Sequence, residues 1–202
     1  MKNKIIITAC AALLAFAIAP GAASAALYSG ATKLPLGSEV RGVSGGVVQF
    51  QSGGQSIINC TSSEWGASLI KNNEGRANAK TEWWGFHGTG PEGLCTSPYG
   101  NVAVIGSPNS CWEAEASSWY LISGSTCGRG LTDFTVYFSG LKPCTYKIAP
   151  TYVYGSTQSP IELSGSGPLL ERLEGNLLCS PTYRLQAGWK ITDGAKNPLT
   201  FK

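Results

Sequence analysis

The sequence has little of what most catalytic and metal sites need. His87 is its single histidine, and none of its seven cysteines forms a Cys-x-x-Cys pair. A zinc site needs several such ligands at short spacing, so no metal centre is expected. A Gly-x-Ser-x-Gly turn, a nucleotide-binding loop leading into a helix and an EF-hand loop are also missing. The sequence therefore predicts neither a metal nor a cofactor.

Charged residues are also scarce, at 13% of the chain, and no basic block occurs. Without Lys2 and Lys4 near the N-terminus, the chain has 13 basic and 12 acidic residues. This balance excludes an electrostatic interaction with nucleic acid or with anionic lipid. Apolar and aromatic residues remain plentiful, which is typical of a folded chain and not of a disordered one.

The N-terminus has the features of a secretory signal peptide. Met1–Lys4 is short and basic, and the run from 5 to 19 is uncharged and apolar. Pro20 and Gly21 break this run, and Ala23–Ala25 supplies the small residues that a signal peptidase requires. We expect residues 1–25 to be cleaved, leaving residues 26–202 as a single disulfide-bonded β domain of 177 residues.

This export signal predicts a secreted or cell-surface location. The apolar run is too short for a membrane span, so we expect none after cleavage. An alternative is a lipoprotein, because Ile7-Thr8-Ala9-Cys10 has the outline of a lipidation box. Most of the hydrophobic run follows Cys10, however, and lipidation there would leave only a very short apolar region before it. Mass spectrometry of the mature N-terminus separates the two hypotheses.

Six cysteines remain after removal of the N-terminal segment. An even number in an exported chain predicts three disulfides, although spacing alone does not choose among the 15 pairings that six cysteines allow. Each closed loop would contribute about 2–4 kcal/mol to stability. The six are Cys60, Cys95, Cys111, Cys127, Cys144 and Cys179.

Short runs rich in β-branched and aromatic residues recur between Gly, Pro, Ser and Asn clusters, whereas helical periodicity is nearly absent. The clearest run is 131–138, where Phe134, Val136 and Phe138 share one face and Asp133, Thr135 and Tyr137 the other. The other expected strands are 47–50, 56–60, 67–71, 102–106, 119–123, 145–154, 161–164, 183–191 and 199–202.

About ten short strands of this kind predict an all-β fold, an antiparallel β-sandwich or flattened barrel stapled by disulfides. The segment 72–100 is rich in Gly and Pro, so we expect a long irregular excursion from the sheets there. Leu169, Leu170 and Leu173 follow Pro168 at helical spacing and suggest one helical turn. No linker or internal repeat divides residues 26–202.

Three short motifs resemble those of a known group of proteins. They are Ile58-Asn59-Cys60-Thr61-Ser62-Ser63, Cys144-Thr145-Tyr146, and Cys179-Ser180-Pro181 followed by an alternating strand. The chain resembles uncharacterised exported proteins of actinobacteria, although Ser180 interrupts the usual Cys-Pro and Trp189 replaces the usual tyrosine. The resemblance implies a secreted β-rich domain. It implies no activity, because that group has none established.

The residues allow two kinds of catalytic site to be considered, a Ser-His-Asp triad and a pair of carboxylates. A Ser-His-Asp triad would need His87 with Asp133 or Asp193, but no serine stands in a suitable turn. A glycoside hydrolase would need two carboxyl groups. Glu113 and Glu115 would share one face of a strand, and Glu82 adjoins an indole. The simpler interpretation of these glutamates is a soluble strand face, so a non-enzymatic protein is expected and a hydrolase is the alternative.

Binding is better supported by the residues than catalysis. Aromatic rings stack on sugars and on other apolar-faced ligands, and the chain has six tryptophans. We predict a binding surface for carbohydrate or another extracellular ligand, formed by Trp83, Trp84, Phe86 and Trp112. The opposing interpretation is that these rings fill a core. In a strand, neighbouring Trp83 and Trp84 must point to opposite faces. A structural protein or an inhibitor module of the cell envelope is a further alternative.

Overall fold

The computed structural model describes residues 25–73, 75–108, 110–115, 118–122, 133–149, 151–153, 161–163 and 166–202. These residues form antiparallel strands and one short 3₁₀ turn, η1 (Pro91–Gly93). The predicted all-β class is confirmed. The predicted signal peptide lies outside the described residues except for Ala25. Within the described part, no helix has the length and apolarity required to cross a membrane.

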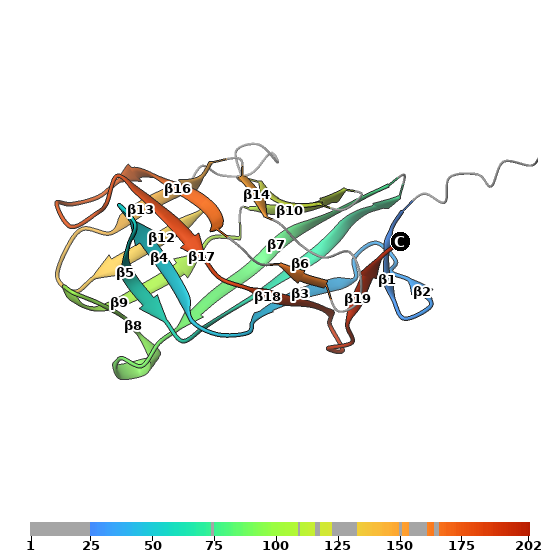
Figure 1. Cartoon of the computed structure of the whole chain (residues 1–202), viewed down its shortest axis with the longest axis horizontal. Helices are drawn as coiled ribbons and strands as arrows, with labels where there is room; N and C mark the ends of the chain where they lie inside the picture. The colour runs from blue at the N-terminus through green and yellow to red at the C-terminus, as the bar shows by residue number, and fades with distance from the viewer. Residues whose placement is uncertain are drawn as a thin grey trace, which may run out of the picture.

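Eight strands close into an antiparallel barrel, seen on the left of Figure 1. The order around the barrel is β12-β13-β16-β17-β4-β5-β8-β9, and β9 pairs with β12 to complete the ring. The strands are β4 (Val48–Ser52), β5 (Gln55–Cys60), β8 (Cys95–Ser97), β9 (Gly100–Gly106), β12 (Phe134–Phe138), β13 (Cys144–Ile148), β16 (Ser166–Glu174) and β17 (Thr182–Gln186).

Two long strands, β6 (Ser62–Asn73) and β7 (Arg76–His87), extend the sheet beyond the barrel. Figure 1 shows them running diagonally from the barrel to the opposite end of the molecule. Beyond β6 follow β3 (Glu39–Ser44), β18 (Trp189–Asp193) and β15 (Ile161–Leu163). On the other side of β7, its C-terminal half pairs with β9 and its N-terminal half with β10 (Cys111–Glu115), followed by β11 (Ser118–Ile122) and β14 (Thr151–Val153).

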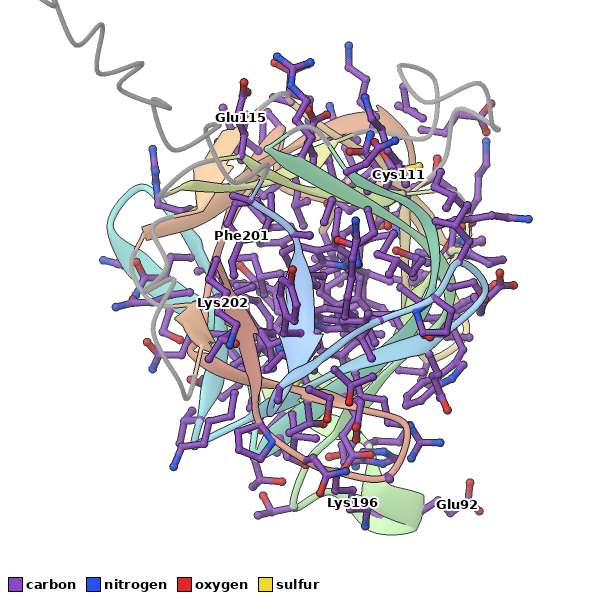
Figure 2. All side chains as sticks on the ribbon, turned by 90° about the vertical axis from the view of Figure 1, so that its right-hand side faces the viewer. Glu92, Cys111, Glu115, Lys196, Phe201 and Lys202 are labelled. Carbon is purple, nitrogen blue, oxygen red and sulfur yellow. A yellow bond between two sulfur atoms is a disulfide. The ribbon has the colours of Figure 1, made fainter. Side chains whose placement is uncertain are left out.

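A small separate sheet closes the end of the molecule away from the barrel. It contains β1 (Leu27–Ser29), β2 (Thr32–Lys33) and β19 (Leu199–Phe201), in the order β19-β1-β2. Ala26 and Lys202 exchange two backbone hydrogen bonds of 2.7 and 3.0 Å. Figure 2, which looks onto this end, shows Phe201 in front of the densely packed interior. Leu27, Leu199 and Phe201 are buried and belong to the same hydrophobic core as the barrel residues.

Disulfides join Cys60 to Cys95 and Cys144 to Cys179, and each pair is separated by 35 residues. The first links the end of β5 to the start of its neighbour β8, and the second links β13 to the turn between β16 and β17. Cys111 is disulfide-bonded as well. Cys127, the sixth cysteine of the prediction, lies outside the described residues. The use of these cysteines as structural cystines is therefore confirmed for the part of the chain that is described.

The core is a continuous column of aromatic rings. In the barrel, Phe50, Phe86 and Phe134 contact one another, with ring centroids 5.4–6.4 Å apart. Trp84 extends the column, because its ring lies 4.9 Å from Phe134 and 5.8 Å from Trp189. Four indoles then pack together where the sheet continues beyond the barrel, with Trp65 and Trp112 stacked at 4.4 Å. The cluster comprises Trp65, Trp84, Trp112 and Trp189.

Glycines opposite the tryptophans make this packing possible. Trp65 lies directly across from Gly42 on β3, and Trp84 directly across from Gly106 on β9. A Cβ at Gly42 would lie 2.2 Å from Cε2 of Trp65, and one at Gly106 would lie 2.4 Å from Cβ of Trp84. Both distances are far below van der Waals contact, so only glycine leaves the indoles room to cross the neighbouring strand.

We expect Gly42→Ala to lower the free energy of unfolding by about 1–3 kcal/mol, because the new methyl group overlaps a ring that the core holds in place. Urea denaturation followed by tryptophan fluorescence measures this loss. Gly46→Ala is the matched control, since a Cβ there meets no atom within 4 Å. Equal stability of the two variants would show that Trp65 is free to move away from β3.

Three sequence-based expectations are wrong. Much of the segment 72–100, predicted as an irregular excursion, belongs to β7, one of the two longest strands. The turn predicted at Leu169–Leu173 lies in β16, because pairing with β13 and β17 outweighs a weak helical spacing. Asp133, expected on the same face as Tyr137, differs from it because Asp133 is buried, where its carboxylate accepts a hydrogen bond of 2.7 Å from the Ile148 N–H, whereas Tyr137 is exposed. Phe134, Val136 and Phe138 do share the buried face, as predicted.

Candidate functional site: the outer face around Trp83

A β-bulge at Glu82 determines which side chains of β7 reach the outer face. Thr81 pairs with Ala67 and Trp83 pairs with Gly66, so Glu82 is an extra residue without an opposite partner. Glu82 and Trp83 consequently both point outward, whereas Thr81 and Trp84 point inward. The predicted opposition of Trp83 and Trp84 is confirmed, since their exposed fractions are 39% and 4%.

Small residues surround the Trp83 ring. A Cβ at Gly66 would lie 2.3 Å from Nε1 of Trp83 and 2.6 Å from Cε2, so this edge of the indole covers Gly66. Two residues further along β7, Gly85 leaves the outer face open next to Trp83. His87 follows on the same face, and its Nε2 would lie 3.6 Å from a Cβ at Gly85. On the outer face of β7, Gly85 therefore lies between the indole of Trp83 and the imidazole of His87.

Neighbouring strands complete this surface, which we call the Trp83 face. Gly85 pairs with Ile105 on β9 and with Glu64 on β6, and Glu64 pairs with Val43 on β3. Ile105 and Val43 are 51% and 39% exposed, so they add apolar area to that of Trp83. The Trp83 face combines an exposed ring and two aliphatic side chains with acidic groups at Glu64 and Glu82.

Arg41 supplies a cation beside this surface, because it pairs with Gly66, the glycine that Trp83 covers. Its Nε donates to the Glu39 carboxylate over 2.7 Å. This hydrogen bond and the charge of Glu39 raise the pKa of the guanidinium. Arg41 is thus held in position as a permanent hydrogen-bond donor.

The structure corrects three of the four predicted binding residues. Trp84, Phe86 and Trp112 are 4%, 8% and 0% exposed and contact one another or the barrel aromatics. They lie in the core because strand alternation on β7 and β10 turns them inward. Among the tryptophans whose side chains the structure describes, Trp83 alone is exposed. Trp119 was not among the predicted binding residues, and its side chain lies outside the description.

Two of the three candidate carboxylates, Glu113 and Glu115, share one guanidinium, and the third, Glu82, lies elsewhere, on β7. Glu113 and Glu115 do share a face of β10, as expected, but both face one guanidinium. Arg76 donates to Glu115 over 2.8 Å, and its Nη1 lies 3.9 Å from Glu113. Glu82 lies four residues along β7 from Asn78, the partner of Glu113, or about 13 Å at the usual strand rise.

The acids considered for a triad with His87 have other positions and partners. Asp133 is buried, whereas His87 is exposed on the outer face. Asp193 is the last residue of β18, and its carboxylate accepts hydrogen bonds from the turn that follows. Partial burial acts to raise the pKa of Asp193, but hydrogen bonds from Asn197, Ser29 and the Ala195 N–H lower it on balance. Each carboxylate thus stabilises a local backbone arrangement.

Other titratable groups serve packing. Burial raises the pKa of Tyr146 and of Tyr183, whose rings contact each other inside the barrel, so both phenols are neutral at physiological pH. Within the described residues, no group of three or more His, Cys, Asp or Glu side chains could hold a metal ion.

Sequence reasoning missed Gly66, Ile105 and Val43 as parts of the Trp83 face. They come from three strands that are distant in sequence, and only the register places them beside Trp83. The bulge at Glu82 was also missed, although it sets the orientation of the whole segment. Glycine at position 66, within a run of strand-forming residues, is the one local signal that indicates close approach by a large side chain.

Comparison of the chain with protein-family models, with curated proteins and with solved structures gives no match in any of the three.

Proposed function

We propose that the protein is an exported, non-enzymatic binding domain that takes carbohydrate on the Trp83 face. One observation carries the proposal: Trp83 stays 39% exposed on a sheet surface where glycines replace its neighbours at positions 66 and 85. Exposing an indole to water is unfavourable, and here the ring covers Gly66 while the outer face beside it at Gly85 stays open to a ligand.

The groups around the indole fit a sugar. Sugars present both apolar C–H faces and hydroxyl groups that donate and accept hydrogen bonds. Trp83 and Ile105 offer apolar contact, while Glu64 and Glu82 can accept from hydroxyl groups and Arg41 can donate. The mixture of acidic and basic groups favours no strongly charged ligand.

Two further features support an extracellular role without catalysis. Buried cystines are typical of proteins that fold in an oxidising compartment, which agrees with the predicted signal peptide. The hydrolase alternative would use Glu113 or Glu115, and both form ion pairs with Arg76, at 3.9 and 2.8 Å. A binding domain explains the exposed ring without assigning a reaction to these carboxylates.

Glycan-array binding tests the proposal. We expect the purified protein to bind at least one glycan, and Trp83→Ala to weaken that binding about tenfold through the loss of ring contact. Trp83→Phe should retain part of the affinity because a planar ring remains.

Tyr99→Ala is the control for a general loss of exposed aromatic area, because Tyr99 is 57% exposed in the β8–β9 turn. Its binding should equal that of the unchanged protein. The proposal is contradicted if no glycan binds, or if Trp83→Ala binds as well as Tyr99→Ala does.

A further inference from the structure

A second polar surface lies on the outside of the barrel, on β17, β4 and β5. Strand β4 alternates, so that Val48 and Phe50 are buried while Gln49 and Gln51 face outward. Gln49 pairs with Gln186 on β17 and with Asn59 on β5. The amide side chains thus form a row across three adjacent strands, which neighbour one another at about 4.8 Å.

A bulge brings one more polar group into this row. Phe50 pairs with Ile58 and Gln51 with Ser56, which leaves Ile57 as the extra residue on β5. Ser56 therefore emerges on the same side as Asn59, and its hydroxyl donates to Oδ1 of Asn59 over 2.7 Å. We call the set Gln49, Gln51, Ser56, Asn59 and Gln186 the amide cluster.

Hydrogen bonds within the amide cluster orient each amide. Nε2 of Gln51 donates to Oε1 of Gln49 over 3.2 Å and also to Oε1 of Gln186. Nε2 of Gln49 donates to Oδ1 of Asn59 over 3.2 Å. These bonds already hold four flexible side chains in place. A ligand that binds them therefore incurs a smaller cost in side-chain conformational entropy.

The internal bonds leave a defined set of groups facing solvent. Within the described part of the chain, two amide nitrogens of the cluster, Nδ2 of Asn59 and Nε2 of Gln186, donate no hydrogen bond to the protein. Within the same part, Oε1 of Gln51 likewise accepts none. The surface therefore offers a donor, an acceptor and a donor, on β5, β4 and β17. The amide cluster itself carries no charge, and Arg184 lies at its edge as the partner of Gln51.

We propose that the amide cluster binds a neutral polysaccharide laid across the strands. Hydroxyl groups complement this surface because each can accept from Asn59 or Gln186 and donate to Gln51. An anionic ligand is not favoured, because the cluster consists of neutral groups and not of several cations. The site is separate from the Trp83 face, and it extends the proposed carbohydrate binding to a second surface on the same chain.

Affinity electrophoresis tests this site. The purified protein is run through native gels that contain a mixed-linkage β-glucan, a mannan, a galactan or alginate, with gels lacking polysaccharide as the reference. We expect at least one of the three neutral polysaccharides to retard the protein. The double variant Gln51→Ala/Gln186→Ala should lose about tenfold in affinity, as the removal of two hydrogen-bonding side chains predicts.

Gln55→Ala is the matched control, because Gln55 is exposed on the same strand pair but lies outside the cluster bonds. Thermal unfolding confirms that each variant is folded. Retardation of the double variant equal to that of Gln55→Ala, or retardation by alginate alone, would overturn the proposal. The proposal would also be overturned if none of the three neutral polysaccharides retarded the unchanged protein.

Trp83→Ala separates this site from the Trp83 face. If Trp83→Ala abolishes retardation and the double variant does not, the proposed function stands and the amide cluster site fails. If the double variant alone loses binding, the amide cluster site stands and the Trp83 face does not bind that polysaccharide, and the glycan array decides whether the Trp83 face binds any other glycan.

Discussion

Trp112→Ala is expected to lower the free energy of unfolding by about 3–5 kcal/mol, the loss usual for a large buried side chain. Trp112 is fully buried, stacks on Trp65 at 4.4 Å and also contacts Trp84 and Trp189. Its removal leaves a cavity bounded by three other indoles, and rings of that size and rigidity cannot collapse into the space. Urea denaturation monitored by circular dichroism measures the change.

Trp83→Ala is the matched comparison, because it deletes the same side chain from the outer face. Its cost should stay below about 1 kcal/mol, as is usual when an exposed residue is replaced. Losses of similar size in the two variants would contradict the assignment of Trp112 to the core and of Trp83 to the surface. The same pair of proteins is informative for binding, where the order of the effects should be reversed.

Replacing Cys144 and Cys179 together by alanine is expected to cost about 2–4 kcal/mol. The disulfide closes a loop with a sequence separation of 35 residues, and its loss increases the conformational freedom of the unfolded chain. It also anchors the β16–β17 turn, where the Asn176 N–H lies 2.8 Å from Sγ of Cys179. Urea denaturation of the double variant, compared with the unchanged protein, measures the loss.

The Cys60–Cys95 disulfide provides a control of equal length, because its residues are also 35 apart. If chain entropy dominates, removing either disulfide should destabilise the protein equally. A larger loss for Cys144 and Cys179 would assign the difference to the turn contacts around Asn176. Unchanged stability in either double variant would contradict a structural role for that disulfide.

Local patterns predicted the strands well where burial alternates. The run that became β12 is the clearest example, since Phe134, Val136 and Phe138 are buried while Tyr137 is exposed. Two longer expected strands each correspond to two strands of the structure: 145–154 covers β13, which ends at Ile148, and β14, which begins at Thr151, and 183–191 covers parts of β17 and β18, with a break at 187–188. The sequence at these two places is Ala149-Pro150 and Ala187-Gly188. Proline and glycine are disfavoured in strands, so a local signal for the division was present and the prediction missed it.

The candidate site was predicted only in part. Trp83 was correctly placed opposite Trp84, because alternation is a local property of an extended chain. The inward orientation of Trp84, Phe86 and Trp112 did not follow from the sequence, since an indole suits a core and a binding surface equally well. Which face of β7 is covered depends on β12 and β18, whose Phe134 and Trp189 meet Trp84 from remote parts of the chain.

The sequence alone determined the all-β class, the role of the described cysteines as cystines and the opposite orientations of Trp83 and Trp84. Composition, residue spacing and strand alternation are sufficient for these features because each depends on neighbours along the chain. Only the tertiary structure decided which indole is exposed and which glycines lie beside it. Those features depend on strand register and on the bulge at Glu82, and register arises from pairing between segments that are far apart in the sequence.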